Sequence, residues 1–275
     1  MNLVVQGAPL APDTLEALRA AAGATAVTAL GPQACRLDNA HHTLPLAALC
    51  RDIGLDCCAT LERRLSDYGL FVTDMDSTLI DIECIDEVAD LAGVKAEVSR
   101  ITEAAMRGEI DFAESLMRRV AQLEGLPESA LAEVYERRLK LNPGAETLIA
   151  ALKGAGIHTV LVSGGFTFFT DRLKTRLGFD AAHANALEVV GGKLTGRING
   201  PIVDAAAKAA VLRDARYRLS LAPDRAIAVG DGANDLLMLR EAGLAIAFHA
   251  KPTLRAVADV CIDHAGLDGI LMLLS

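Results

Sequence analysis

Two aspartates stand one residue apart, directly after an apolar run of the sequence. In "GLFVTDMDSTLID" (69–81), Asp74 and Asp76 follow the residues "LFV", and a serine and a threonine come next. Like charges at the end of a buried strand repel each other and lose their hydration, so they need a cation nearby. The pair therefore indicates a site that holds a metal ion, a basic side chain or both.

Polar residues also follow two later strand-like segments. Ser163 and Gly164 end the segment "HTVLVSG". Asp231 ends "RAIAVGD", and Asn234 and Asp235 open the helix that comes next. Because ligands bind beyond the carboxyl ends of the strands in an open parallel sheet, we expect these residues to lie beside the aspartate pair.

The expected convergence of four aspartates predicts a metal site. Uncompensated carboxylates at one point would be very costly. A set of oxygen ligands without histidine or cysteine is typical of a hard cation, for which Mg²⁺ is the default. The ligand candidates are Asp74, Asp76, Asp231 and Asp235.

The same edge of the sheet is expected to bind a phosphate. Mg²⁺ leaves coordination positions free for water and for substrate phosphate. Lys208, in the helix-like segment "DAAAKAAVLRDARYRL", is the candidate second cation. The Ser163 hydroxyl and the Gly164 amide can donate hydrogen bonds to phosphate oxygens. Together these groups predict a clamp for phosphoryl transfer.

The clamp gives each aspartate of the pair a role. One carboxylate can attack phosphorus and form an aspartyl-phosphate. The other can protonate the leaving oxygen and then deprotonate the water that breaks the intermediate. We assign Asp74, at the strand end, as the nucleophile. Alternation along the chain turns Asp76 over the same site, which suits the acid and base role.

From residue 69 onward, short apolar strands alternate with helices, so we expect an α/β fold with a parallel, Rossmann-like sheet covered on both faces. The expected strands are 70–74, 158–164, 225–231, 244–249 and 260–262. The expected helices are 143–156, 167–178, 205–219, 234–243 and 251–259. The "GG" within 186–198 predicts a β-hairpin.

Two parts of the chain depart from this alternation. Residues 82–142 contain only helix-forming sequence, which predicts an all-helical cap, or lid, inserted in the core at 69–275. Residues 1–68 have the order βαββαβ of a small ferredoxin-like domain, with a last strand expected at 55–61. Such domains bind amino acids or form homodimers, and the sequence does not decide between these roles.

The composition excludes several classes of protein. A formal net charge of −9 argues against general affinity for nucleic acid or anionic membranes. No apolar stretch is long enough to cross a bilayer, and the N-terminus has no cationic segment typical of a secretory signal. The six cysteines show no CxxC pair and no zinc spacing, so we expect reduced, mostly buried thiols in a cytoplasmic protein.

The motifs "DMDST", "SGG" and "GDGAND", with Lys208, resemble the four motifs of the haloacid-dehalogenase-like phosphatase superfamily, in its order. The stretches "DMDSTLIDIECIDEVADLAG", "SGGFTFF" and "GDGANDLLML" are similar to its phosphoserine phosphatase family, over about 69–265. The resemblance implies Mg²⁺-dependent hydrolysis of L-phosphoserine through an aspartyl-phosphate, the last step of serine biosynthesis. It also implies a haloacid-dehalogenase-like fold.

The resemblance implies roles for the core residues one at a time. Asp74 matches the nucleophile and Asp76 the acid and base. Asp231 matches the metal ligand, beside a carboxylate oxygen of Asp74 and the backbone carbonyl of Asp76. Asp235 matches a residue that supports the metal ligands. Ser163 and Lys208 match phosphate binders, Gly164 an amide that orients substrate, and Asn234 a residue near the phosphate.

The cap residues also have counterparts in the family. Glu83 matches the group that faces the substrate ammonium, and Arg119 the cation that faces its carboxylate. The adjacent Arg118 is the competing arginine. Met106 and Phe112 match lid residues that close over the site and exclude water.

Three alternatives remain open at this point. A phosphotransferase, or a phosphatase for another small phosphomonoester, would share the core and differ in the lid. A non-catalytic amino-acid sensor would not need the intact aspartate pair. An energy transducer resembling the cation-transport ATPases of the superfamily would have threonine two residues after the nucleophile, where this chain has Asp76.

Overall fold

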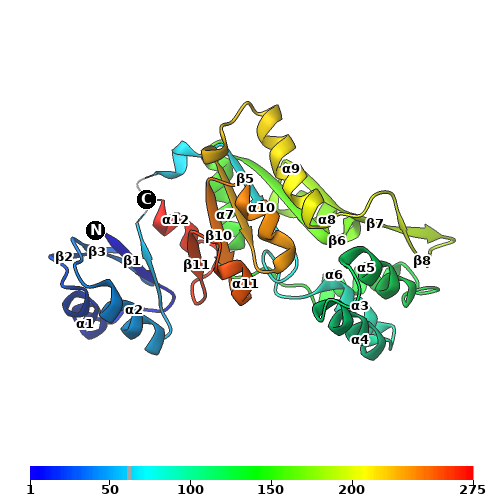
Figure 1. Ribbon diagram of the computed structural model, residues 1–275, viewed down its shortest axis with the longest axis horizontal. Helices are drawn as coiled ribbons and strands as arrows, with labels where there is room; N and C mark the ends of the chain where they lie inside the picture. The colour runs from blue at the N-terminus through cyan, green and yellow to red at the C-terminus, as the bar shows by residue number, and fades with distance from the viewer. Residues whose placement is uncertain (61–62, 275) are drawn as a thin grey trace.

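The computed structural model describes residues 1–60 and 63–274, which form two β-sheets (Figure 1). The smaller sheet is antiparallel, with the strand order β2-β3-β1-β4. Its strands and helices are β1 (Leu3–Gln6), α1 (Pro12–Ala22), β2 (Ala26–Gly31), β3 (Ala34–Asp38), α2 (Thr43–Asp52) and β4 (Asp56–Ala59). The ferredoxin-like order is confirmed, and Leu61 of the expected last strand lies outside the described residues.

The larger sheet has the order β11-β10-β9-β5-β6-β7-β8 and is parallel except for β8. Its strands are β5 (Leu70–Thr73), β6 (His158–Phe166), β7 (Ala181–Val190), β8 (Lys193–Asn199), β9 (Ala226–Gly230), β10 (Leu244–Phe248) and β11 (Val260–Ile262). The expected hairpin at 186–198 is present. Its first strand begins earlier, because residues 181–183 pair with β6, although "AAH" has none of the β-branched residues typical of strands.

Helices cover both faces of the larger sheet, as the alternation predicts. Phe71 of β5 packs in one buried cluster with side chains of α7 (Ala145–Gly154), α8 (Thr167–Leu177) and α12 (Gly269–Leu273). Leu70 and Val72 pack on the opposite face. Their cluster includes side chains of α9 (Ala205–Arg218), α10 (Leu236–Arg240) and α11 (Pro252–Arg255). The short helix α12 was not expected from the sequence. Single 3₁₀ turns lie at Leu65–Asp67, Pro223–Arg225 and Ala233–Asp235.

Four of the five helices between β5 and β6 lie at the opposite end of the molecule from the small sheet (Figure 1). They are α3 (Cys84–Leu91), α4 (Lys95–Met106), α5 (Phe112–Ala121) and α6 (Ser129–Arg137). The loop after α5 pairs with β8, since the Gly125 and Leu194 amides donate to Leu194 (2.8 Å) and Leu126 (2.9 Å). This segment is all-helical, and its boundaries at 82 and 142 stay predictions.

The small sheet is joined to the C-terminal segment of the core by a buried carboxylate. Asp56 of β4 accepts hydrogen bonds from the backbone amides of Asp263 (2.8 Å), His264 (3.1 Å) and Ala265 (2.8 Å). Gln6, its cross-strand neighbour in β1, is also buried. A carboxylate that accepts three amides fixes the sheet on the core by directional bonds.

The described residues bear on two further expectations from composition. All six cysteines are free thiols, but only three of them are buried and the other three are half-buried, so the thiols are less buried than expected. Across the helices of residues 1–60 and 63–274, none has the length and apolar character needed to cross a membrane.

Candidate active site

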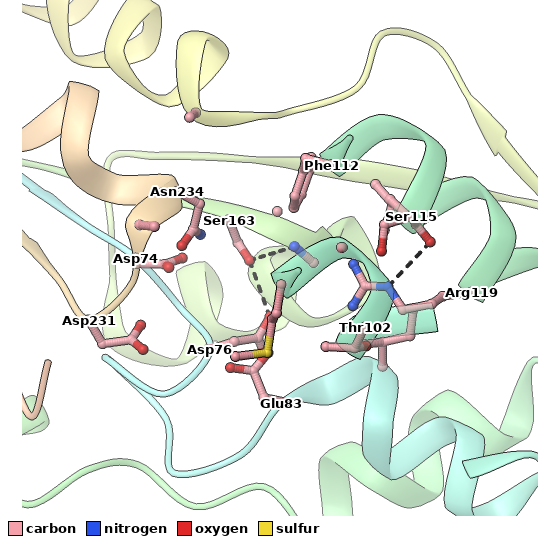
Figure 2. Close-up of a pocket in the computed structure, with 18 of the residues that line it drawn as sticks. Asp74, Asp76, Glu83, Thr102, Phe112, Ser115, Arg119, Ser163, Asp231 and Asn234 are labelled. Atoms are coloured by element: carbon pink, nitrogen blue, oxygen red, sulfur yellow. Dashed lines mark hydrogen bonds between the residues drawn. The ribbon is translucent and has the colours of Figure 1, made fainter. Parts of the chain in front are cut away.

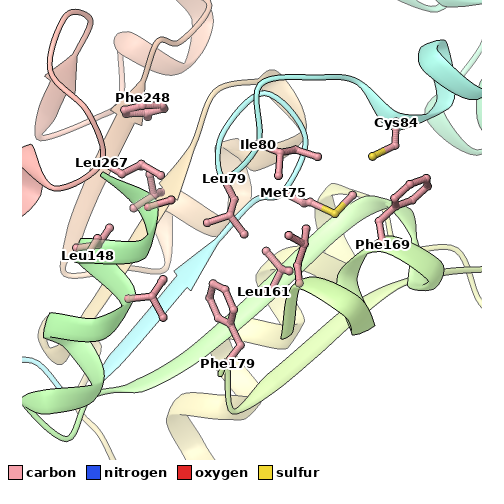
Figure 3. Close-up of a cluster of buried hydrophobic side chains, with 14 of the residues drawn as sticks. Met75, Leu79, Ile80, Cys84, Leu148, Leu161, Phe169, Phe179, Phe248 and Leu267 are labelled. Carbon is pink, nitrogen blue, oxygen red and sulfur yellow. The ribbon is translucent and has the colours of Figure 1, made fainter. Parts of the chain in front are cut away.

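The aspartate pair is held by the side chain between its two members. Asp74 and Asp76 follow β5, and both line one pocket. Met75 points the other way and is completely buried against the hydrophobic cluster that includes Leu161 and Phe169 (Figure 3). Met75 therefore anchors the segment after β5 in the core, while the carboxylates on either side of it face the pocket.

Lys208 contacts Asp74, and its positive charge offsets the negative charge of that carboxylate. Its Nζ is 2.7 Å from Asp74 Oδ2 and 2.7 Å from Asp235 Oδ1. The lysine is 0% exposed, and it projects from α9, whose first turn is capped by Asp204. Burial alone would lower the pKa of Lys208, but Asp235 and Asp74 outweigh it and raise that pKa. The lysine is therefore a fixed positive charge at working pH.

Asp235 is bonded through both of its oxygens. Oδ1 contacts Lys208, and Oδ2 accepts the backbone amides of Asp231 (3.2 Å) and Gly232 (3.1 Å). A Cβ at Gly230 would come within 2.5 Å of this carboxylate, so only glycine fits there. Asp235 thus ties the end of β9 to Lys208 of α9.

Among the described residues, no lysine forms an ion pair with Asp231, although the charge of Lys251 opposes the rise of its pKa. Thr78 donates a hydrogen bond to its Oδ1 (3.2 Å), and burial together with the nearby Asp235 raises the pKa of Asp231 to about 6. Burial and Asp235 also raise the pKa of Asp74, against the opposing effect of Lys208. The negative charges of the cluster are therefore only partly compensated by the protein.

These carboxylates fit a hard divalent cation. One oxygen from each of Asp74, Asp231 and Asp235 lies within 4.8 Å of the others, and all three residues are buried. Among the described residues, Lys208 is the one cation that forms an ion pair with them. An oxygen-only donor set with excess negative charge is what Mg²⁺ prefers.

Asp76 is placed for proton transfer. Its Oδ1 accepts the Cys84 amide (3.0 Å), and its Oδ2 lies 3.5 Å from the Ser163 hydroxyl. Burial, followed by the charge of Glu83, raises the pKa of Asp76 to about 7, while the Cys84 hydrogen bond opposes the rise. A group with a pKa near neutrality can both give and take a proton.

A pocket of about 610 Å³ lies between the carboxyl ends of the strands and the helices of the insertion (Figure 2). Ten of the twelve residues singled out in the sequence line it. They are Asp74, Asp76, Glu83, Met106, Phe112, Arg119, Ser163, Gly164, Asp231 and Asn234. The other two, Lys208 and Asp235, are fully buried beside this lining. The convergence of strand ends that the sequence predicts is therefore found.

The insertion places opposite charges on the pocket wall. Arg119 donates to the Ser115 carbonyl (3.4 Å) and forms no ion pair with any residue in the described ranges. Burial lowers the pKa of its guanidinium, which the carboxylates of Asp86 and Glu83 oppose. Arg118 instead pairs with Glu114 on the exposed side of α5. Of the two arginines, Arg119 is thus the one that faces the pocket.

Several lining residues were not singled out from the sequence. One of them, Gly165, lies inside the recognised motif "SGG". Thr78 of "DMDST" was also not singled out; it is buried behind the lining. Thr78 contacts Asp231, while a Cβ at Gly165 would approach Asp76 Oδ2 to 2.6 Å. The others include Thr102, Ser115, Lys251 and Thr253, none of which was assigned a role from the sequence.

Comparison with known proteins gives two family matches. Residues 71–240 match the model of the haloacid dehalogenase-like hydrolases. Residues 3–45 match a domain of unknown function (DUF4072).

Relatives and solved structures agree with the first of these matches. A phosphoserine phosphatase of Polaromonas sp. is 54% identical over 220 residues, which is 78% of this chain and 93% of that protein. The crystal structure of a probable phosphoserine phosphatase from Vibrio cholerae has a TM-score of 0.87 at 39% identity, and covers 99% of this chain and 86% of that chain. A phospho-aspartyl intermediate analogue of phosphoserine phosphatase has a TM-score of 0.71 at 41% identity, and covers 76% of this chain and 99% of that chain.

Replacing Lys208 tests its role as the internal counter-charge. Lys208→Met keeps the length of the side chain and leaves Asp74 and Asp235 without their cation. Breaking a buried pair in this way costs about 3–5 kcal/mol, so urea unfolding at pH 7.5 should show a loss of about that size. The loss should shrink at lower pH, since protonation removes the uncompensated charge. Lys193→Met, on the exposed surface of β8, should change stability by less than about 0.5 kcal/mol. Equal effects of the two substitutions would contradict the assignment.

Proposed function

Because the chain belongs to the haloacid dehalogenase-like hydrolase family, we propose that it is a Mg²⁺-dependent phosphatase that hydrolyses L-phosphoserine to L-serine and phosphate. The observation that supports this substrate is the half-buried Arg119, which forms no ion pair among the described residues and lines the same pocket as Glu83 and Asp74. Phosphoserine has a phosphate, a carboxylate and an ammonium group, and the pocket offers a partner for each. The names of the relatives support the same substrate.

In this mechanism Asp74 attacks the phosphorus atom and becomes an aspartyl-phosphate. Asp76 gives its proton to the departing serine oxygen and then takes one from the water that hydrolyses the intermediate. Lys208 neutralises Asp74 and is close enough to meet the transferred phosphate. When Mg²⁺ is held by Asp231, Asp74 and the Asp76 carbonyl, with Asp235 in support, it neutralises charge on the phosphate oxygens.

The remaining residues hold the substrate. Ser163 and the Gly164 amide bind and orient the phosphate, with Asn234 beside it. Arg119 faces the carboxylate, and Glu83 faces the ammonium. Phe112, whose ring lies 3.0 Å from where a Gly164 Cβ would stand, and Met106, which lines the pocket but is 75% exposed, would close over the bound substrate and exclude water.

The reaction and its metal are tested together by measuring phosphate release. Phosphoserine should be hydrolysed with Mg²⁺, and EDTA should abolish turnover until Mg²⁺ is restored. Ca²⁺ should inhibit, because its larger and looser coordination shell spoils the in-line geometry. Phosphothreonine and simple alkyl phosphates should be poorer substrates. Full activity after thorough chelation would rule out a catalytic role for Mg²⁺. An alkyl phosphate that is hydrolysed faster than phosphoserine would contradict the proposed substrate.

Substitutions of the aspartate pair should separate the two chemical steps. With p-nitrophenyl phosphate, Asp74→Asn should release no nitrophenolate above background, since it has no nucleophile. Asp76→Asn should release about one equivalent quickly and then stall, because the aryl leaving group needs little protonation whereas hydrolysis of the intermediate needs the base. Stopped-flow absorbance measures both. A burst from Asp74→Asn would place the nucleophile elsewhere.

Charge recognition by the cap is tested with Arg119→Ala. Removing one partner of a desolvated charge pair costs about 2–5 kcal/mol, so kcat/KM for phosphoserine should fall roughly 30-fold to 4,000-fold. An aryl phosphate without a carboxylate should be little affected. Arg118→Ala is the matched control and should be mild. Equal losses on both substrates would make Arg119 a general structural residue.

We further propose that residues 69–275 form the catalytic core, with the cap at about 82–142, and that residues 1–68 form a separate unit. The fragment 69–275 should hydrolyse phosphoserine with a kcat within a few-fold of the full chain. The phosphoserine phosphatase that covers 76% of this chain leaves about a quarter without a counterpart, which supports this expectation. The fragment should unfold at a lower temperature than the full chain, since it lacks the hydrogen bonds that Asp56 accepts. A folded but inactive fragment would contradict the division.

We place the enzyme in the cytoplasm, in keeping with its six free thiols.

A further inference from the structure

Asn142 lies where the chain leaves the helical insertion, and it contacts the turn that follows the aspartate pair. Its Nδ2 donates hydrogen bonds to the carbonyl oxygens of Thr78 (2.8 Å) and Ile80 (3.2 Å). Its backbone amide donates to the carbonyl of Leu79 (3.0 Å). A side-chain amide has two N–H groups, and both are used here. Three consecutive carbonyls of the turn therefore have their donors on one residue.

The other side of the same turn is fixed by Met75. The amides of Thr78, Leu79 and Ile80 all donate to the Met75 carbonyl, at 3.3, 2.8 and 3.0 Å. The side chains of Met75, Leu79 and Ile80 are buried in the hydrophobic cluster (Figure 3). The turn is thus held from inside by Met75 and from outside by Asn142.

The turn carries the hydroxyl that orients Asp231. Thr78 is completely buried, and its Oγ1 donates to Asp231 Oδ1. Its own carbonyl is one of the two acceptors of Asn142 Nδ2. Because Thr78 is buried, water cannot replace Asn142 as the donor to its carbonyl. Without Asn142 the carbonyl would shift, and the hydroxyl of the same residue would move away from Asp231.

The same stretch joins the two chain segments that lead to the insertion. Ile80 and Leu141 form an antiparallel bridge. The Asp81 amide donates to the Lys140 carbonyl (3.0 Å), and the Lys140 amide donates to Asp81 Oδ1 (3.1 Å). Asn142 is therefore the core-side end of a hydrogen-bonded pair of linkers.

We propose that Asn142 is a positioning residue that holds the turn 75–80 so that Thr78 orients Asp231 for Mg²⁺. The role requires two N–H donors on a short side chain. Leucine and aspartate offer none, and serine offers one. The link to catalysis rests on the proposed function, whereas the effect on Mg²⁺ binding does not.

The proposal is tested by calorimetric titration of Mg²⁺ into the full chain without substrate. Loss of a group that orients a metal ligand typically costs 10–100-fold in affinity, so Asn142→Ala and Thr78→Val should each weaken Mg²⁺ binding about tenfold. If Asn142 acts through Thr78, the double variant should lose no more than either single variant. Asn199→Ala, at the exposed end of β8, should bind Mg²⁺ as the wild type does.

Thermal unfolding in EDTA separates this role from a merely structural one. A residue that only stabilises the fold would lower the melting temperature of the metal-free chain and leave Mg²⁺ affinity unchanged, which would overturn the proposal. Losses that multiply in the double variant would also overturn it. If Asn142→Ala does not fold, Asn142→Ser replaces it, alone and combined with Thr78→Val, and the same results support or overturn the proposal. A wild-type chain that binds Mg²⁺ but releases no phosphate from phosphoserine would overturn the proposed function alone.

Discussion

The structure depends on burying three carboxylates around a single ammonium group. Removing a charged group from water costs several kcal/mol, which only close, well-oriented partners can offset. Lys208 meets that requirement with two contacts of 2.7 Å, to Asp74 and Asp235. Asp231 is left with a hydroxyl partner, so the protein presents an unbalanced negative charge at the floor of its pocket. That imbalance fits a divalent cation, which would in turn favour an anionic substrate.

The arrangement of strands follows from the same constraint. β9 lies directly beside β5 in the parallel sheet, so Asp231 and Asp235 come next to Asp74 without any long connection. α9 packs against the face of the sheet that carries Leu70 and Val72 of β5, and its Lys208 contacts Asp74. The insertion between β5 and β6 then covers the open end and adds Glu83 and Arg119. In the proposed function, the core binds the phosphate and the insertion recognises the rest of the substrate.

Much of this arrangement can be predicted from the sequence because it depends on strand ends. Polar residues such as Asp74, Ser163 and Asp231 interrupt apolar runs, and the topology of a parallel sheet brings them together. Contacts that depend on three-dimensional packing could not be predicted. Lys208 was expected at the phosphate, but its observed partners are Asp74 and Asp235. The role of Asn142 depends on carbonyls more than sixty residues earlier, and no local pattern marks it.

The most direct test of this account is to trap the covalent intermediate and locate it. The Asp76→Asn variant is mixed with p-nitrophenyl phosphate, whose leaving group needs little protonation, and Mg²⁺, then quenched and reduced with borohydride, which converts an acyl phosphate to the alcohol. Peptide mass spectrometry should then find residue 74 converted from aspartate to homoserine, in an amount that depends on substrate and Mg²⁺. Reduction at another carboxylate, or phosphate release by this variant with no trapped residue, would contradict the central claim that Asp74 carries the phosphoryl group.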